Sequence, residues 1–349
     1  HADERKDYGA TAEQAERFLK RVAERLGVTA EHVFPAFEDV YYYLWRERRL
    51  PGNVDPFDSR VDDPLERERL MKVFTQGLTH TVGHVLPIMK DTRDQWQTGP
   101  WFLRAERCYL IPGDSPLGYR LPLDSQPWTA QSDYPYVNPP DAEMAQASLP
   151  SHAAYRVAAM GQPAGQQPAR AQMRVQAPAF GQGGPDGLGH PWDKPTDTVP
   201  GFKESAAWIT RLAMCAEPRD GKLYIFMPPT QTLEDYLEVV AAVEATAEEL
   251  QLPVILEGYE PPSDPRLTHF RVTPDPGVIE VNIHPAKSWD QLVDQTTHLY
   301  DSSYNAPPTT EKFMLDGRHT GTGGGNHFVL GGATPNDSPF LRRPDLLRS

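Results

Sequence analysis

The stretch Ala213–Pro229, AMCAEPRDGKLYIFMPP, holds two short apolar runs on either side of a tight-turn sequence. Asp220 and Gly221 form the turn, and an Asp-Gly pair between two apolar runs is a strong signal of a β-hairpin. The stretch therefore predicts two adjacent antiparallel strands. A second stretch, His269–Pro285, predicts another pair of strands about its PDPG turn.

Helical patterns alternate with these strands along the chain. Thr11–Leu26 has apolar residues at helical spacing, a capping-box pattern of Thr11 and Gln14, and Gly27 after its last residue. Because tight turns place neighbouring strands antiparallel while helices alternate with them, the predicted fold class is α+β. Further helices are predicted within residues 35–51, 62–78, 233–251 and 288–304, and a further buried strand within residues 252–258.

The chain divides into four predicted regions. Residues 1–100 are expected to be mainly helical, and residues 101–128 to form a strand–turn–strand segment about PGDSPLG. Residues 129–203 are rich in Pro, Gln, Gly and Ala, a composition that buries too little apolar area to offset the entropy of ordering it, so we expect a mobile insertion there. Residues 204–349 form the predicted core, which we expect to continue beyond Ser349 in a longer protein.

Composition argues against several classes of protein. With 349 residues, of which 39% are hydrophobic, the chain is long enough to bury one or two cores. A formal net charge of -14 argues against nucleic-acid-binding and membrane-surface proteins, which carry basic surfaces. Cys108 and Cys215 are too few for a disulfide framework and lack metal-ligand spacing. The sequence shows no signal peptide or bilayer-spanning apolar run, so we expect a cytoplasmic protein.

A glycine-rich stretch, RHTGTGGGNHFVLGG, covers Arg318–Gly332 and contains a short apolar run. It predicts a glycine loop that enters a strand, with Asn326 and His327 at the junction. Glycine lets a ligand approach the main chain closely, so a phosphate-bearing ligand is one interpretation. A loop that only shapes a sheet is the alternative.

Polar side chains also occur within apolar strands or at their ends. Glu280 and Asn282 share one face of their predicted strand, and Glu257 ends another strand. Carboxylate and amide oxygens suit a hard cation such as Mg²⁺, which prefers oxygen ligands. The alternatives are a structural asparagine, a solvated strand-end glutamate, and structural roles for His284 and His327.

Three long strings carry a family resemblance: VTPDPGVIEVNIHPAKSWDQL (272–292), EKFMLDGRHTGTGGGNHFVLGGATP (311–335) and SPFLRRPDLLRS (338–349). They resemble the inferred amidoligase domain attached to bacterial transglutaminase-like proteins, a family regarded as glutamine synthetase-like. The resemblance is tight over residues 212–349, and IPGDSPLGYRLPLDS extends it upstream. It implies a glutamine synthetase-like core, that is, a mainly antiparallel sheet with helices on one face.

The resemblance also implies ATP and Mg²⁺ as cofactors. GVIEVN is similar to the family's metal-binding glutamate strand, and TGTGGGNH is similar to its glycine-rich histidine segment. The first acidic strand of the glutamine synthetase pattern has its nearest, poor counterpart at Glu217. The implied metal ligands are Glu257, Glu280, Asn282 and His327. The implied phosphate-binding residues are Gly323, Gly324, Gly325, Asn326, Arg342 and Arg343. The implied catalytic residues are Glu280, His327, Arg342 and Arg343.

The implied reaction is the ATP-dependent joining of a carboxylate to an amine. The γ-phosphoryl group passes to the carboxylate, and the amine then attacks the acyl phosphate to give an amide or peptide bond, which requires cations rather than a protein nucleophile. We expect a small-molecule or peptide substrate with a free carboxylate and amine, and a covalently linked transglutaminase-like domain in the full-length chain. A catalytically inactive nucleotide- or peptide-binding module is the alternative, and activity of this stretch alone stays open.

Overall fold

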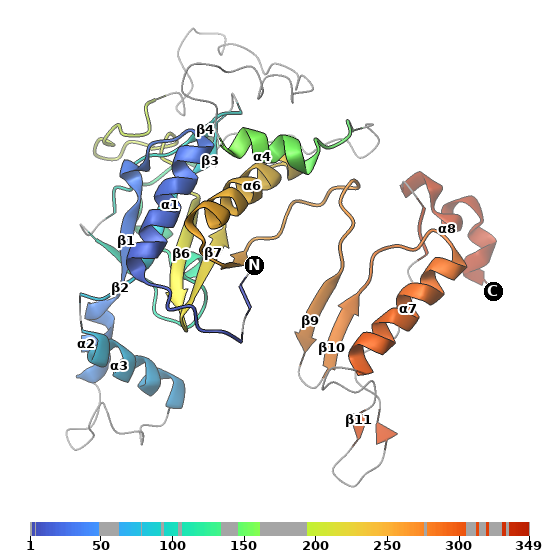
Figure 1. The fold of residues 1–349 in the computed structure, drawn as a ribbon. Coiled ribbons are helices and arrows are strands. Elements are labelled where there is room, and N and C mark those ends of the chain that lie inside the picture. Colours follow the sequence, from blue (N-terminus) through green and yellow to red (C-terminus); the bar gives the residue numbers. More distant parts are fainter. Residues whose placement is uncertain are drawn as a thin grey trace. The chain divides into compact units, whose positions relative to one another are not determined.

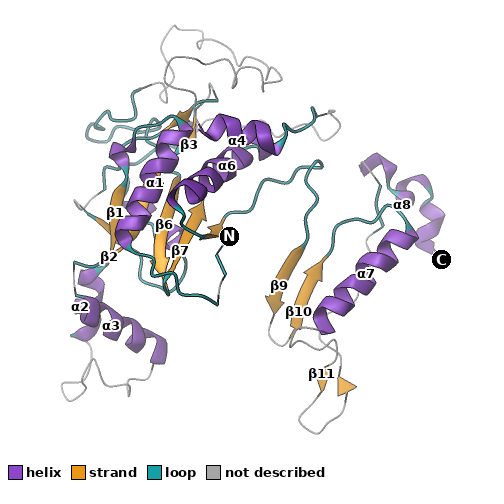
Figure 2. Cartoon of the chain, viewed as in Figure 1, coloured by secondary structure: helices purple, strands orange, loops and turns teal. Residues whose placement is uncertain are grey.

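The structure is a computed structural model, drawn as a ribbon in Figure 1 and by secondary structure in Figure 2. Its described residues fall into two compact units, one built from His1–Val137 with Leu149–Pro262 and the other from Asn138–Ser148 with Ser263–Ser349. The structure describes residues 2–3, 5–48, 63–77, 79–91, 94–103, 107–133, 146–160, 194–275, 278–304, 312–313, 319–320, 330–332 and 335–348.

A six-stranded sheet forms the centre of the first unit, with the strand order β5-β1-β2-β6-β7-β8. The pairs β1–β2, β2–β6 and β6–β7 are antiparallel, whereas β1–β5 and β7–β8 are parallel, so the sheet is mixed. The strands are β1 (Phe34–Glu38), β2 (Thr81–Pro87), β5 (Cys108–Leu110), β6 (Ala213–Arg219), β7 (Lys222–Met227) and β8 (Val254–Gly258).

The hairpin predicted within Ala213–Pro229 is confirmed as β6 and β7. Asp220, with φ 50°, and Gly221, with φ 69°, adopt the left-handed backbone that a two-residue hairpin turn of matching twist requires. The chain then passes through helix α6 (Leu233–Leu250), which allows β8 to lie parallel to β7.

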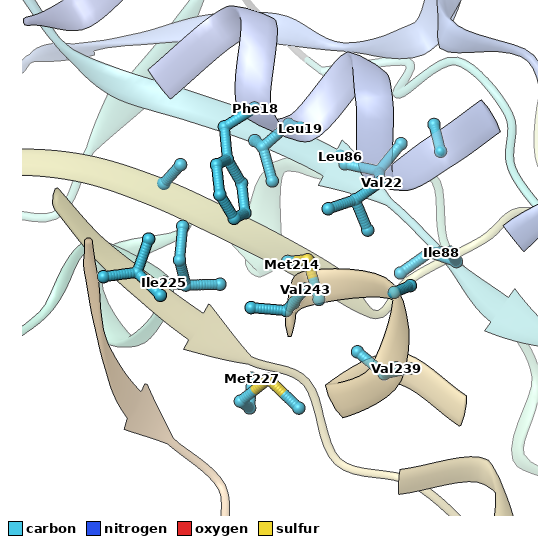
Figure 3. Packing of buried hydrophobic residues seen from close by; sticks show 14 of the residues in the cluster. Phe18, Leu19, Val22, Leu86, Ile88, Met214, Ile225, Met227, Val239 and Val243 are labelled. Carbon is cyan, nitrogen blue, oxygen red and sulfur yellow. The ribbon is translucent and has the colours of Figure 1, made fainter. Parts of the chain in front are cut away.

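Helices α1 (Ala12–Leu26) and α6 cover one face of the sheet, as Figure 1 shows. The predicted capping box of α1 is confirmed, because the Gln14 amide donates to the Thr11 hydroxyl and the Thr11 amide donates to the Gln14 side chain. In the described part of the chain, every helix is too short or too polar to cross a bilayer. The core between helices and sheet includes Phe18, Leu19, Val22, Leu86, Ile88, Met214, Ile225, Met227, Val239 and Val243 (Figure 3).

The opposite face of the sheet carries a second apolar cluster. Because side chains alternate along a strand, Cys215 on β6 and Phe226 on β7 point away from α1 and α6. A 3-10 turn, Leu117–Arg120, packs on this face through Leu117. The cluster leaves room on the same face for the charged side chains at the ends of β6 and β8.

Two expectations for the N-terminal part are not confirmed. Among the described residues of 1–100, β1 and β2 belong to the central sheet, although α2 (Val40–Glu47) and α3 (Pro64–Gln76) form beside α1. Within the described residues 101–103 and 107–128, the one strand is β5, and 3-10 turns follow it instead of a returning strand. The prolines of this segment explain the difference, because they lack the N–H that a strand ladder requires. Two further short strands, β3 (Met89–Lys90) and β4 (Trp96–Gln97), pair with each other.

Part of the predicted insertion is folded. Helix α4 (His152–Met160) packs on α6, and its Tyr155 and Ala159 are buried against that helix. Arg25 of α1 donates to the Ala159 carbonyl at 3.0 Å, so α4 contacts α1 as well as α6. Residues 134–145 and 161–193 of the insertion lie outside the described residues, so their predicted mobility stays a prediction.

The second unit contains the other predicted hairpin, which is confirmed as β9 (Arg271–Asp275) and β10 (Val278–Asn282). Helix α7 (Trp289–Tyr304) follows, and Ser288 caps its start, because the Gln291 amide donates to the Ser288 hydroxyl at 3.2 Å. The remaining elements are short: β11 (Lys312–Phe313), β12 (His319–Thr320) and α8 (Pro339–Arg342).

His84 on β2 makes stability depend on pH in a definite direction. The imidazole is buried beneath α1, and its Nδ1 has no hydrogen-bond partner among the described residues. Burial lowers the pKa of His84, while the carboxylates of Glu16 and Glu13 oppose that shift and Lys20 adds to it. Below about pH 6.5 the unfolded chain therefore binds a proton that the folded chain does not, so the folded state loses stability as the pH falls.

We expect His84→Gln to flatten this pH dependence, because the amide does not titrate. Thermal midpoints of wild type and variant, measured at pH 8 and pH 5.5, give the comparison. His80→Gln, four residues away and exposed, is the matched control and should keep the wild-type slope. Equal losses of stability on acidification in wild type and His84→Gln would contradict the assignment.

Candidate functional site

Three charged side chains form a bridged group on the sheet face opposite α1 and α6. Glu217 and Arg219 come from β6, and Glu257 comes from β8, with β7 between them. The Arg219 guanidinium donates from Nη1 to Glu217 Oε2 at 2.8 Å and from Nη2 to Glu257 Oε2 at 2.6 Å. One cation thus links carboxylates on two strands that are not neighbours. We call Glu217, Arg219 and Glu257 the carboxylate–arginine group.

Strand geometry explains why these residues meet. Glu217 and Arg219 lie two and four residues after Cys215, so alternation puts all three on one face. Glu257 pairs with Phe226 in the parallel β7–β8 ladder, which places it on the same face. The long arginine side chain crosses β7 by stacking on Tyr224, with its central carbon 3.8 Å from the ring centroid.

Burial makes the charges of this group costly unless they are paired. The Glu217 side chain is 10% exposed and that of Glu257 is 14% exposed. Burial raises the pKa of Glu217, and the charge of Glu257 adds to that rise, while Arg219 and the Leu117 amide oppose it. Burial alone would lower the pKa of Arg219, but its hydrogen bond to Glu257 and both carboxylate charges raise it above the ordinary value. The arginine therefore stays charged and holds the pair together.

One oxygen of the group has no partner. Glu257 Oε1 is buried and accepts no hydrogen bond from any described residue, whereas its Oε2 accepts from Arg219. Leaving a buried acceptor unmatched costs about 1–3 kcal/mol. A ligand that donates a hydrogen bond or a positive charge at this oxygen would recover that cost.

The 3-10 turn Leu117–Arg120 extends the charged surface toward β1. The Leu117 amide donates to Glu217 Oε2 at 3.2 Å. Arg120 donates to Glu38 Oε2 at 2.5 Å and to the Ile111 carbonyl at 2.8 Å. The turn therefore fixes Glu217 from the backbone and adds a second carboxylate–arginine pair on the neighbouring part of the sheet.

Aromatic rings lie on the same side of the sheet as Glu257. Tyr119 contacts Phe226 edge to face, with ring centroids 4.9 Å apart and planes at 89°. The ring centroid of Tyr259 lies 6.1 Å from that of Phe226 and 5.9 Å from that of Tyr119. Phe226 is buried, whereas Tyr119 and Tyr259 are 52% and 47% exposed. Two solvent-facing tyrosines thus stand beside the strand that carries the unmatched carboxylate oxygen.

The cysteines do not supply a nucleophile. Cys108 and Cys215 are both buried free thiols. Burial raises the pKa of Cys108 to about 12, and burial, followed by the charges of Cys108, Glu217 and Glu257, raises the pKa of Cys215 well above its ordinary value. Neither thiol is ionised at neutral pH, and the thiolate is the reactive form.

In the second unit, the predicted shared face of Glu280 and Asn282 is confirmed. The Asn282 amide Nδ2 donates to Glu280 Oε1 at 2.8 Å, and both side chains are exposed. Thr273 and Arg271 are their cross-strand partners on β9. Asn282 therefore makes a local hydrogen bond, as the structural alternative expects. Its acceptor is Glu280, the other residue of the predicted pair.

Other residues that the sequence pointed to make local contacts. His284 shares a 2.7 Å hydrogen bond with Gln295 of α7. Arg342 pairs with Asp337, and Arg343 donates to Asp345 at 2.6 Å and 2.9 Å. Both arginine side chains are exposed, at a surface of the second unit.

The predicted convergence of the metal ligands stays a prediction. Gly323, Gly324, Gly325, Asn326 and His327 lie outside the described residues. Glu257 belongs to the first unit and Glu280 to the second. Within the described ranges, no three histidine, cysteine, aspartate or glutamate side chains are grouped closely enough to hold a metal ion.

Sequence reasoning missed Arg219 entirely and gave Glu217 only a weak role. The signal that could have found them is the spacing in CAEPRDG, where Glu217 and Arg219 share a strand face two residues apart. Their link to Glu257 across β7 depends on the parallel β7–β8 register, which no local pattern specifies.

Comparison with known proteins identifies the family. A family model described as "Putative amidoligase enzyme (DUF2126)" matches residues 1–349, so the chain belongs to this family. Neither the curated proteins nor the solved structures contain a match to the chain.

We expect Arg219→Met to destabilise the first unit by on the order of 3 kcal/mol, because it leaves two largely buried carboxylates without their cation. Urea unfolding monitored by tryptophan fluorescence measures the change. The triple variant Glu217→Gln, Arg219→Met and Glu257→Gln should recover most of the loss, since it removes the charges together.

Arg21→Met is the control for this prediction. Arg21 pairs with Glu24 and Glu249 at the protein surface, so its removal should cost within about 1 kcal/mol. If Arg219→Met were no more destabilising than Arg21→Met, the carboxylate–arginine group would not be a buried network.

Proposed function

We propose that the protein is an ATP- and Mg²⁺-dependent ligase that joins a carboxylate to an amine through an acyl phosphate. A carboxylate oxygen of the substrate attacks the γ-phosphorus of ATP, and ADP leaves. The ammonium group of the second substrate loses a proton, the resulting neutral amine attacks the acyl carbon, phosphate leaves, and the nitrogen loses a second proton. The membership of the whole chain in an amidoligase family supports the ligase class.

The observation that carries this proposal is the carboxylate–arginine group, with its unmatched Glu257 Oε1 on a sheet face not covered by α1 and α6. Ligation brings together an anionic acid and a cationic amine, so the site requires groups of both signs at close range. Arg219 supplies the positive charge, and Glu257 supplies a negative charge with an acceptor to spare. Their burial strengthens both interactions relative to water.

The cofactor part of the proposal rests on the second unit. Glu280 and Asn282 place a carboxylate and an amide group next to each other on an exposed strand, and carboxylate and amide oxygens are ligands that suit Mg²⁺ with several retained waters. His327 would complete the metal ligands of this unit, whereas Glu257 belongs to the first unit and is not part of the proposed metal site. Gly323 to Asn326, Arg342 and Arg343 would bind the phosphates. A bound Mg²⁺ would neutralise the charge that develops on the transferred phosphoryl group.

Other expectations from the sequence belong to the same proposal. A glutamine synthetase-like core and a covalently linked transglutaminase-like domain follow from the resemblance carried by the sequence strings, and we propose a cytoplasmic location alongside them. The substrate would be a small molecule or peptide with a free carboxylate and a free amine.

A second candidate function is a nucleotide- or peptide-binding module without turnover. Its support is that the exposed pair of Glu280 and Asn282 could hold Mg²⁺-ATP whether or not turnover follows. Such a module would bind Mg²⁺-ATP or peptide but would release no ADP.

Glu280→Gln tests the ligase proposal, because it removes an anionic metal ligand while nearly preserving volume. Since Glu280 is exposed, we expect the thermal midpoint to change little. Mg²⁺-dependent ADP release by the full-length protein, supplied with a mixture of carboxylates and hydroxylamine as the trapping nucleophile, should fall by at least about 100-fold.

Asp290→Asn, at an exposed acidic position on α7, is the matched control and should keep full ADP release. A Glu280→Gln variant that still turns over ATP at the wild-type rate would end the metal-ligand role. ATP binding by the wild type without any ADP release would favour the binding module.

A further inference from the structure

We propose that Glu257, Tyr119 and Tyr259 form a recognition site for a primary alkylammonium group, and so mark where the amine substrate binds. The inference rests on the proposed function for its link to ligation, but the binding itself does not require ATP. Four properties of the described residues support it, namely an unmatched acceptor, a net charge, an aromatic surface and a backbone shaped to hold that surface.

The unmatched acceptor defines what the ligand must donate. Glu257 Oε1 is buried without a hydrogen-bond partner among the described residues, while Glu257 Oε2 is already bonded to Arg219. An N–H donor satisfies this oxygen and ends the cost of an unmatched buried acceptor. A ligand that only accepts hydrogen bonds gains nothing there.

The net charge defines the sign and size of the ligand's charge. The carboxylate–arginine group contains two carboxylates and one guanidinium, which leaves one negative charge in a largely buried setting. A single positive charge neutralises it. A divalent metal would require further anionic or polar ligands, and the described residues offer no third metal-ligating group beside these two.

The aromatic rings define the part of the ligand next to the charge. Glu257 is the cross-strand partner of Phe226, so their side chains are neighbours on one face, and Tyr119 and Tyr259 both contact Phe226. Aromatic faces attract cations and cover the apolar carbons bonded to them. An alkylammonium with a short carbon chain therefore matches both the rings and the carboxylate.

The backbone around Tyr119 is shaped to hold this arrangement. Gly118 lies directly on the Phe226 ring, and a β-carbon at Gly118 would lie 2.2 Å from that ring. Any side chain at position 118 would push the turn, and Tyr119 with it, away from the sheet. The close approach of Tyr119 to Phe226 therefore depends on a residue without a side chain.

The test uses n-butylammonium chloride as the probe, titrated into the protein at constant ionic strength without ATP or Mg²⁺ and followed by calorimetry. We expect saturable binding that butan-1-ol does not reproduce and that tetramethylammonium reproduces only weakly, because it lacks an N–H donor. Equal binding of the alcohol would show an apolar surface only. Displacement of the probe by stoichiometric Mg²⁺ would show that Glu257 Oε1 is a metal ligand. Either result would overturn the proposal.

Four variants assign the binding to these residues. Tyr119→Leu and Tyr259→Leu should each weaken binding about two- to fivefold, the range expected for a partly exposed cation–π contact. Glu257→Gln should weaken it at least about tenfold. Tyr41→Leu, which changes a tyrosine that is 72% exposed on α2, should leave binding unchanged. Because both site tyrosines are half exposed, their variants should fold even if Glu257→Gln does not.

Absence of saturable binding, or unchanged affinity in both tyrosine variants, would refute the site. Binding that follows these expectations in a protein that releases no ADP would keep the ammonium site and refute the ligase. ADP release without butylammonium binding would keep the ligase and refute the ammonium site. The failure of one proposal can therefore be told apart from the failure of the other.

Discussion

The central strand β6 has to serve two faces of the sheet at once, and the arrangement of the first unit follows from that constraint. Its even-numbered side chains, Met214 and Ala216, lie in the core beneath α1 and α6. Its odd-numbered side chains, Cys215, Glu217 and Arg219, point to the other face. A shift of one residue in register would place two charges in the hydrophobic core. The apolar packing therefore fixes the position of the charged group.

The same constraint links stability to the candidate site. Arg219 must cross β7 to reach Glu257, and it does so by stacking on Tyr224. Removing the arginine would leave buried like charges, whereas retaining it leaves only one acceptor, Glu257 Oε1, unmatched. Buried charge networks are costly to assemble and contribute little net stability, so net stability gives little reason to bury these three charges.

Local patterns predicted the elements that depend on neighbours in sequence. The Asp220–Gly221 turn, the capping box of α1 and the β9–β10 hairpin all rest on contacts within a few residues, and all three form. The strands β1 and β2 were missed because they pair with partners distant in the sequence. The helix predicted within residues 233–251 forms as α6, but it is buried on more than one side, against the sheet and α1 and, at Ala241 and Ala245, against α4.

The candidate site shows the same division between local and long-range information. The shared face of Glu280 and Asn282 follows from strand alternation and is confirmed. Glu217, Arg219 and Glu257 meet through the β6–β7–β8 order, which only the folded sheet specifies. The most direct measurement of ligation is isotope transfer from a carboxylate substrate labelled with ¹⁸O. We expect one labelled oxygen in the released inorganic phosphate, because an acyl phosphate carries it there. ADP release with unlabelled phosphate would contradict the ligase proposal.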